Sequence, residues 1–391
     1  MFSYFGVPEQ KIKPISVKIY NFIEIAKKIN IYVEKNKLNR YLYLENDVKN
    51  ILDESRDRGF PINVEKYEEY IQQLEDDYKN TKSNNLDFNN KNILLENLNK
   101  RNKYMSLHPE ILIIEDEELY NNLAIVNRFN MYKKNEKVNI GDGVLYIEYD
   151  TYNIHTFCIK ESFVPNYFYY DKNISILEGS YNDIYFKILA ELSRDNSLIL
   201  KASKGTMLDY ISETIGMKTK DNSSSIMIGM FLNAYANRRY DEKSITNHLY
   251  HYWDTYISSN DVKNMNKLFY AKMPELMSFF KTFDGNDTDY ARYNTKIFHP
   301  HLNLHQFILQ IENLIYKTSI KYIYKAITDY NEKYEKNAIL FGGVFEKKII
   351  LLANREHSDV AIDILNRYMA VAYRRYIKKT KYFNATEIKK K

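Results

Sequence analysis

Two short apolar runs near the end of the chain, separated by a charged pair, constrain the fold more than any other feature. The runs span residues 338–345 and 348–353, and Glu346-Lys347 lies between them. Apolar runs joined by a short polar turn are typical of a β-hairpin. Residues 358–379 follow with apolar side chains at helical spacing, which predicts an amphipathic helix with a basic tail.

Two further segments are predicted to be strands. Residues 144–149 are apolar and aromatic and follow the turn signal Gly141-Asp142-Gly143, and residues 173–178 form a second such run. From residue 184 to residue 330 the pattern is almost wholly helical. The chain is therefore expected to be an α+β protein that is mainly helical.

A helix, a tight loop and a second helix are predicted nearer the N-terminus. Residues 48–56 have apolar side chains at helical spacing, and Gly59 and Pro61 end that pattern. Asn63 is then expected to cap a long helix over residues 64–79.

Length and composition exclude several classes of protein. The 391 residues correspond to two or three domains, or to one unit of several lobes, and 45% hydrophobic with 27% charged residues is a soluble globular composition. Cys158 is the only cysteine, so a disulfide within the chain and a cysteine-based zinc site are excluded. Neither a secretory signal nor an apolar run of about 20 residues is visible. An intracellular, cytoplasmic protein without a membrane partner is expected.

The charge is mildly basic, with a formal net charge of +5. This excess permits an anionic partner without demanding one. The 37 tyrosines and 20 phenylalanines stand beside one tryptophan, which is the composition that coding DNA rich in A and T produces. Such a composition would suit a virus or a mobile element, and the location would then be the cytoplasm of the host.

Conventional catalytic signatures are absent from the sequence. No nucleotide-binding glycine loop, zinc-protease helix, nucleophile elbow or EF-hand pattern occurs. The histidines are scattered, and pairs such as His248 with His251, or His299 with His301, have no third ligand at a recognised spacing. We therefore interpret them as surface or packing residues.

Two segments resemble family A DNA polymerases. Residues 44–63, with an acidic and apolar helix followed by Arg58-Gly59-Phe60-Pro61, are similar to the start of the polymerase domain and its "RRG-I-P-V-D" pattern. Residues 181–193 read Tyr-Asn-Asp-Ile-Tyr-Phe-Lys-Ile-Leu-Ala-Glu-Leu-Ser and resemble motif A, "DYSQIELRxLAHLS".

The resemblance continues in the same order along the chain. Residues 269–276 are similar to the "YFxxYPGV" segment, and Asn313 and Lys325 match the frame of the "NxxxQGxAADxxK" helix. Residues 339–369 resemble the hairpin and helix that carry motif C. The resemblance implies thumb, palm and fingers around a nucleic-acid cleft.

The resemblance also implies how the chain is divided. The expected parts are an N-terminal helical segment (1–43), a thumb-like helical region (44–139), a first palm part (140–205), a fingers-like helical region (206–310) and a second palm part with the C-terminal helix and basic tail (311–391). Residues 140–200 and 335–391 should then form one palm sheet. In that sheet the hairpin should pair beside the strand that ends near Ser180.

The same alignment removes the metal chemistry of the family. Family A polymerases hold two Mg²⁺ ions with two aspartates, and the alignment puts Ser180 and Phe345 at those two positions and Tyr185 at the motif A glutamate. A hydroxyl and an aromatic ring are poor or impossible Mg²⁺ ligands. The two should lie across the palm from each other without a shared metal. A shifted alignment would make Asp183 or Asp359 the metal ligand instead. Mg²⁺ is expected as a cofactor only if the chain is an active enzyme.

The fingers helix has lost nucleotide contacts in the same way. When Gly229 is aligned with the glycine of "NFGxxYG", Lys220 stands at the position of an arginine of the family. Ser224 then stands at the position of the lysine that contacts the incoming triphosphate, and Leu232 at the position of the tyrosine. The resemblance therefore implies an inactive palm and fingers that keep basic residues. The expected contacts to phosphates are Lys187, Arg194, Lys220, Arg238, Arg239 and Lys325.

Three functions follow from these expectations. The first is a catalytically inactive pseudo-polymerase, without metal or cofactor, that binds a DNA duplex or primer-template, or RNA, or that scaffolds a replication or transcription complex through a protein partner. The second is an active, divergent DNA polymerase. The third is a protein-interaction subunit that binds no nucleic acid.

Overall fold

The computed structural model describes residues 24–28, 30–31, 34–35, 39–61, 64–83, 139–141, 144–146, 173–217, 223–253, 257–284, 303–345, 347–380 and 386–390. The helices are α2 (Asn39–Arg58), α3 (Val64–Ser83), α6 (Ile184–Ser193), α7 (Asn196–Ser203), α8 (Met207–Ile215), α9 (Ser223–Ala236), α10 (Glu242–Trp253), α11 (Ser259–Lys272), α12 (Pro274–Thr282), α13 (Leu304–Lys333), the short η6 (Arg355–His357) and α14 (Ser358–Tyr376). The strands are β1 (Phe60–Pro61), β2 (Asn139–Gly141), β3 (Val144–Tyr146), β4 (Ile174–Tyr181), β5 (Ile339–Phe345), β6 (Lys348–Asn354) and β7 (Thr386–Lys390). The chain is mainly helical, as expected.

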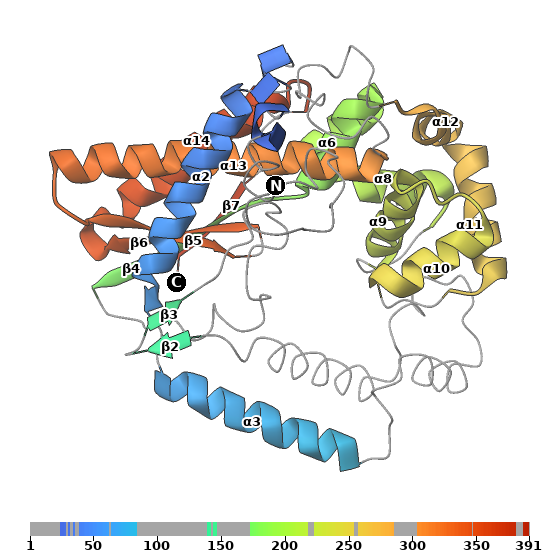
Figure 1. Ribbon diagram of the computed structural model, residues 1–391. Helices are drawn as coiled ribbons and strands as arrows, with labels where there is room; N and C mark the ends of the chain where they lie inside the picture. The colour runs from blue at the N-terminus through green and yellow to red at the C-terminus, as the bar shows by residue number, and fades with distance from the viewer. Residues whose placement is uncertain are drawn as a thin grey trace.

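A four-stranded antiparallel sheet has the order β5-β6-β4-β7. The hairpin of β5 and β6 is the one that the two apolar runs predict, and Lys347 takes the left-handed conformation at its turn, with φ of 62°. β6 pairs with β4 from Ser180 opposite Lys348 to Ile174 opposite Asn354. The expectation that the hairpin lies beside the strand ending near Ser180 is confirmed, although the helical region from α6 to α13 separates them in sequence (Figure 1).

The strands around residue 140 do not join this sheet, contrary to expectation. β3 pairs with β2 on one side and with β1 on the other, in a separate three-stranded sheet. The partner of β3 is thus Phe60–Pro61, the short segment where Gly59 and Pro61 end helix α2. The tight loop after α2, rather than the main sheet, provides the hydrogen bonds that these strands need.

Helices α13 and α14 cover one face of the four-stranded sheet. A Cβ atom on Gly179 of β4 would lie 2.9 Å from the sulfur of Met369 in α14, so the glycine lets the side chains of the helix pack directly against the strand. The next residue on the same face, Tyr181, donates its hydroxyl to the Met369 carbonyl and contacts Ser319 Oγ of α13, each at 2.7 Å. Sheet and helices therefore form two layers around a buried aromatic core.

A group of helices, α8 to α12, packs beyond one end of α13 (Figure 1). Helix α9 is apolar on nearly every side, and Ile228, Phe231 and Leu232 are fully buried. Such a helix lies in the interior of a helical cluster rather than on its surface. A capping box of Asn303 and Gln306 starts α13 beside this cluster.

Helix α2 lies along α13 through charged contacts. Lys317 Nζ lies 2.5 Å and 2.7 Å from the two carboxylate oxygens of Glu45, and Lys321 Nζ lies 2.5 Å from Asp47 Oδ2. The Lys317 side chain is 1% exposed, whereas those of Lys321 and Asp47 are about 40% exposed. We call these four residues the charged seam.

Two carbonyls of β5 bind the end of helix α2. Ser55 donates to the carbonyl of Gly342, and Arg58 donates to that of Phe341. A register shift between Phe341 and Gly343, where φ is 128°, turns these carbonyls out of the ladder. None of the described helices is long and apolar enough to cross a membrane.

Candidate functional site

The end of β4, the hairpin turn and β7 place four residues in one row. Ser180 pairs with Lys348 of β6 and with Glu387 of β7, and Lys348 also pairs with Phe345 of β5. Paired residues on neighbouring strands lie on the same face of a sheet, and Gly179, the neighbour of Ser180, faces α14. The row therefore lies on the face of the sheet opposite to α14, with a lysine between the two positions where the resemblance expects metal ligands.

Two lysines of the hairpin turn face buried glutamates. Lys348 Nζ lies 3.9 Å from Oε2 of Glu178, which is buried on β4, and Lys347 Nζ lies 3.0 Å from Oε1 of Glu312 on α13. Glu312 is fully buried, so burial raises the pKa of its carboxyl, while Lys347 acts in the opposite direction. The turn therefore supplies a cation to each of two carboxylates.

The two positions where the resemblance expects metal ligands do not fit a Mg²⁺ site. Magnesium takes carboxylate, phosphate and water oxygens in octahedral geometry, and these positions hold a serine and a phenylalanine with a lysine between them. The row has one acidic residue, Glu387 of β7, which pairs with Ser180. Glu178 and Glu312 face lysine ammonium groups.

The two aspartates that a shifted alignment would use are far apart. Asp183 is exposed just before α6 and has a φ of 50°. Asp359 is exposed in the first turn of α14, which follows the end of β6 remote from Lys348. β6 has seven residues and so spans about 20 Å at ~3.3 Å per residue. A pair of metal ions needs ligands about 4 Å apart, so these aspartates cannot complete one site in this arrangement.

A second polar cluster joins α9 to its surroundings through uncharged groups. Asn233 of α9 contacts His248 Nε2 of α10 at 2.9 Å through Oδ1 and His305 Nδ1 of α13 at 3.2 Å through Nδ2. Tyr185, at the motif A glutamate position, has its hydroxyl 3.1 Å from the same His305 nitrogen. We call these four residues the neutral junction.

Burial dominates the ionisation of the neutral junction. Burial lowers the pKa of His248 and the pKa of His305 to about 4 each. The charge of Arg239 adds to the shift at His248. His248 and Lys347 add to the shift at His305. Burial also raises the pKa of Tyr185, and the charge of Glu312 adds to that shift. At neutral pH these histidines and the tyrosine are uncharged, which agrees with the interpretation of His248 as a packing residue.

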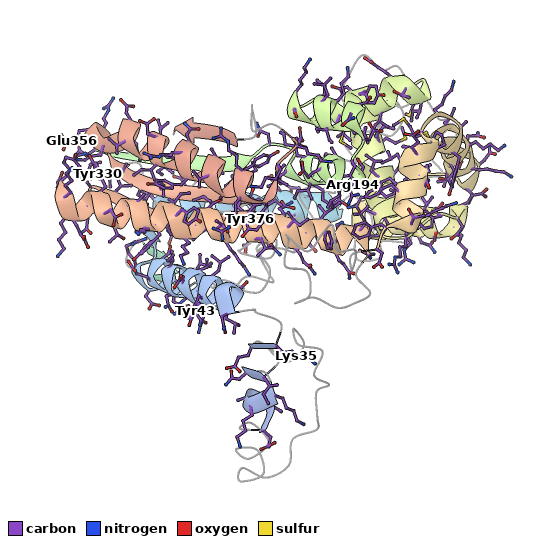
Figure 2. All side chains as sticks on the ribbon, turned by 90° about the horizontal axis from the view of Figure 1, so that it is seen from above. Lys35, Tyr43, Arg194, Tyr330, Glu356 and Tyr376 are labelled. Carbon is purple, nitrogen blue, oxygen red and sulfur yellow. The ribbon has the colours of Figure 1, made fainter. Side chains whose placement is uncertain are left out.

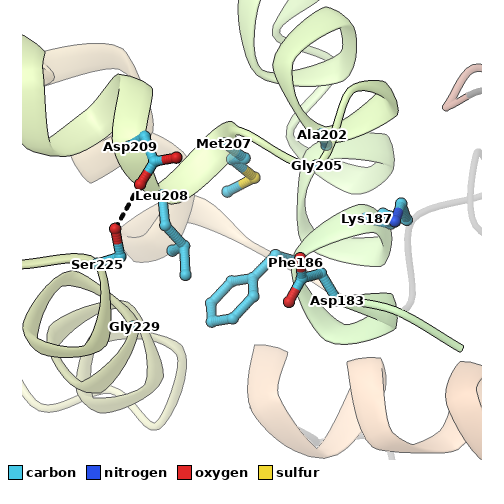
Figure 3. A pocket seen from close by; sticks show the side chains of 10 residues that line it. All are labelled: Asp183, Phe186, Lys187, Ala202, Gly205, Met207, Leu208, Asp209, Ser225 and Gly229. Carbon is cyan, nitrogen blue, oxygen red and sulfur yellow. Dashed lines mark hydrogen bonds between the residues drawn. The ribbon is translucent and has the colours of Figure 1, made fainter. Parts of the chain in front are cut away.

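A pocket of about 460 Å³ opens between α6, α8 and α9. Asp183, Asp209 and Ser225 supply its polar atoms, and Asp209 accepts a hydrogen bond of 2.5 Å from Ser225 (Figure 3). Phe186 extends into it, whereas the amine of Lys187 points away from the other side chains in Figure 3. Two carboxylates make this pocket unsuited to a polyphosphate, because like charges repel at short range.

The basic residues expected at phosphates lie in different environments. Lys187 is 1% exposed and donates to the Asn182 carbonyl at 2.7 Å, and burial lowers its pKa. This position argues against a direct phosphate contact for Lys187. The side chains that lie exposed are Arg194, Arg238, Arg239 and Lys325. Lys220 lies outside the described residues.

One cluster of metal-ligand type lies elsewhere. Within the part of the chain that the structure describes, only Glu335, Glu356 and His357 bring three such groups together. They lie beside Tyr330 at the end of α13 and α14 remote from α6, as the labels of Tyr330, Glu356 and Arg194 show in Figure 2. His357 Nε2 lies 2.9 Å from Glu335 Oε2 and His357 Nδ1 lies 2.9 Å from the Tyr330 hydroxyl, so hydrogen bonds explain the cluster.

Comparison with known proteins gives a match by structure alone. The chain matches no family model and none of the curated protein sequences. It is similar to the polymerase domain of Pol1 from M. smegmatis, solved in complex with DNA primer-template and dNTP. The TM-score is 0.63 and the identity 11%, over 94% of this chain and 73% of that one.

The chain shares the fold of a family A DNA polymerase domain. The four-stranded sheet with α13 and α14 contains the segments that the sequence predicts to be the palm, and α9 lies in the segment that it predicts to be the fingers. This division stays a prediction. The row of Ser180, Lys348 and Phe345 lies at the hairpin turn of this sheet.

Several residues of this site were missed by sequence reasoning. Lys347 and Lys348 read as an ordinary polar turn, and Glu178 and Glu312 stand alone in apolar segments. A charged residue inside a buried strand or helix is itself a signal, because such residues are seldom buried without a partner. That signal could have pointed to Glu178, but it does not name the lysine that pairs with it.

Proposed function

We propose that this chain is a polymerase-like protein that binds nucleic acid without catalysing nucleotidyl transfer. The row of Ser180, Lys348 and Phe345 carries the proposal, because it puts a hydroxyl, an ammonium group and a phenylalanine where the fold would need metal carboxylates. The loss of both aspartates removes catalysis, but it also removes negative charge that would repel a phosphate backbone. A DNA primer-template is the first ligand to test, since the similar Pol1 domain was solved with one.

The exposed basic side chains support a binding role. Arg194, Arg238, Arg239 and Lys325 offer charges that contact phosphates and carry no sequence information. Binding of this kind is independent of sequence and weakens steeply with salt, because each contact releases a counterion. A scaffolding role in a replication or transcription complex, with a protein partner, follows from the same inactive palm.

A titration and an extension assay test this proposal together. We expect fluorescence anisotropy to show primer-template binding at low salt, with no primer extension in Mg²⁺ and the four nucleotides. Changing Arg194 and Lys325 to Ala should weaken binding to all sequences equally and reduce the salt slope by about 1 to 2. Extension that is abolished by Asp183→Ala or Asp359→Ala would establish an active polymerase instead. No binding at low salt would leave only a role in protein interaction.

A further inference from the structure

The pocket between α6, α8 and α9 is not lined by any of the exposed basic residues that support nucleic-acid binding. Its volume of about 460 Å³ lies in the range of small-ligand sites. Asp183 and Asp209 provide two carboxylates, whereas Phe186, Met207 and Leu208 provide apolar surface. In Figure 3 these three apolar side chains lie between the two aspartates. The pocket therefore presents a carboxylate on either side of an apolar surface.

Both carboxylates have room for a further hydrogen-bond donor. Asp209 accepts a hydrogen bond from Ser225 through Oδ1, but a carboxylate has about four acceptor sites on its two oxygens. Asp183 stands at the N-cap position of α6 with a φ of 50°, and its side chain makes no capping hydrogen bond. Both aspartates are exposed, so a cation from solution can reach them.

Lys187 is the one cation among the described residues that line the pocket. Burial lowers its pKa, and the charge of Asp183 acts in the opposite direction, so these two groups attract each other. The Lys187 amine donates to the Asn182 carbonyl at 2.7 Å and points away from the other side chains of the pocket. Two carboxylates against one cation leave the pocket with an excess of negative charge.

We propose that this pocket binds an aliphatic diamine or polyamine, with one ammonium group at each aspartate and the methylene chain along the apolar side chains. An ammonium group donates charge-assisted hydrogen bonds to a carboxylate, and methylene groups gain free energy when apolar side chains cover them. A single Mg²⁺ ion demands close, near-octahedral oxygen ligands, which carboxylates on either side of an apolar surface do not supply. This site is separate from the phosphate contacts, so the inference does not depend on the proposed function.

The first experiment compares linear diamines of increasing length with monoamines of the same length, by isothermal titration calorimetry at low ionic strength. Only a matching chain spans both carboxylates, so the diamine affinity should pass through a maximum, about tenfold above that of the matched monoamine. Equal affinities of diamine and monoamine at every length would overturn the proposal. Displacement of the best diamine by Mg²⁺, beyond that by NaCl at the same ionic strength, would also overturn it, because it would indicate an inorganic cation site.

Variants of the two aspartates test which groups bind the ligand. Asp183→Asn and Asp209→Asn each remove one charge, and Asn tolerates the left-handed conformation at position 183. Each should weaken the best diamine about tenfold, to the level of the monoamine. Asp329→Asn is the control with the same change in net charge, because Asp329 is exposed on α13 and does not line the pocket. It should change the affinity by less than about twofold, and a loss equal to that of the pocket variants would refute the site.

A second control separates the Asp209 charge from its hydrogen bond. Ser225→Ala removes the donor but keeps the carboxylate, and it should bind the best diamine within about threefold of wild type. A loss as large as that of Asp209→Asn would contradict a direct role of the carboxylate. Near-UV circular dichroism shows whether each variant keeps its tertiary packing. The best diamine should also raise the unfolding temperature of the wild-type chain more than that of either aspartate variant.

Discussion

The charged seam and the neutral junction both join elements that lie far apart in sequence, but with opposite chemistry. The charged seam fixes α2 on α13 through Glu45, Asp47, Lys317 and Lys321, and half of these side chains are well exposed. The neutral junction fixes α9 to α6, α10 and α13 through an amide, two imidazoles and a phenol. Buried groups must be paired or uncharged. The charged seam meets this condition by pairing the buried Lys317 with Glu45, whereas the neutral junction meets it with groups that can be neutral at physiological pH.

Acid should have the largest effect, and it should act on the neutral junction. The pKa of each histidine lies near 4 in the folded chain and near 6.5 when unfolded. The unfolded chain therefore takes up more protons between these values, and stability present above pH 6.5 is lost as the pH falls towards 4. From pH 7 to pH 5 we expect a loss of about 2 kcal/mol for each histidine, measured by urea unfolding. Arg239, Lys347 and Glu312 are charged groups that act on the pKa values of the junction residues.

Replacement of His248 and His305 by Gln provides the control for that effect. The double variant keeps hydrogen-bonding groups but cannot take up a proton at either position. Its stability should therefore fall much less between pH 7 and pH 5. An unchanged pH dependence would assign the acid sensitivity to other groups.

Breaking the buried pair of the charged seam should have the next largest effect. Lys317→Met leaves the Glu45 carboxylate without the ammonium group that contacts both of its oxygens, at a cost of about 3 kcal/mol. Denaturant unfolding at pH 7 measures this loss. Adding Glu45→Gln should recover most of it, since a buried pair replaced as a whole is often neutral. A double variant as unstable as the single one would show that the packing of Lys317, rather than its charge, matters.

The exposed pair of the same seam should matter least. Lys321 and Asp47 are each about 40% exposed, and pairs of this kind contribute less than about 1 kcal/mol. Lys321→Met should therefore change the unfolding free energy by about 0.5 kcal/mol or less, and salt should reduce the difference further. A loss as large as that of Lys317→Met would mean that exposure does not separate the two pairs.

Elements with a periodic apolar pattern could be predicted from the sequence, whereas contacts between remote polar residues could not. The hairpin and α14 follow from apolar periodicity, and the pairing of the hairpin with β4 follows from the resemblance of residues 181–193 and 339–369 to motifs A and C. The neutral junction could not be predicted, because Asn233 and His305 carry no periodic signal and meet only through the tertiary fold. Lys187 shows a further limit, since the sequence frame gives its basic character but not that its amine donates inward to the Asn182 carbonyl.

The position of β4 has a consequence for how the chain acquires its fold. Both strands that pair with β4, β6 and β7, lie more than 150 residues later in the sequence. Sheets built from such remote pairings form slowly, because a long loop must lose conformational entropy before any stabilising contact forms. During synthesis β4 therefore has two unpaired edges until β6 and β7 have left the ribosome, and exposed strand edges are templates for aggregation. A nascent chain stalled before residue 348 should be a better chaperone substrate than the finished protein.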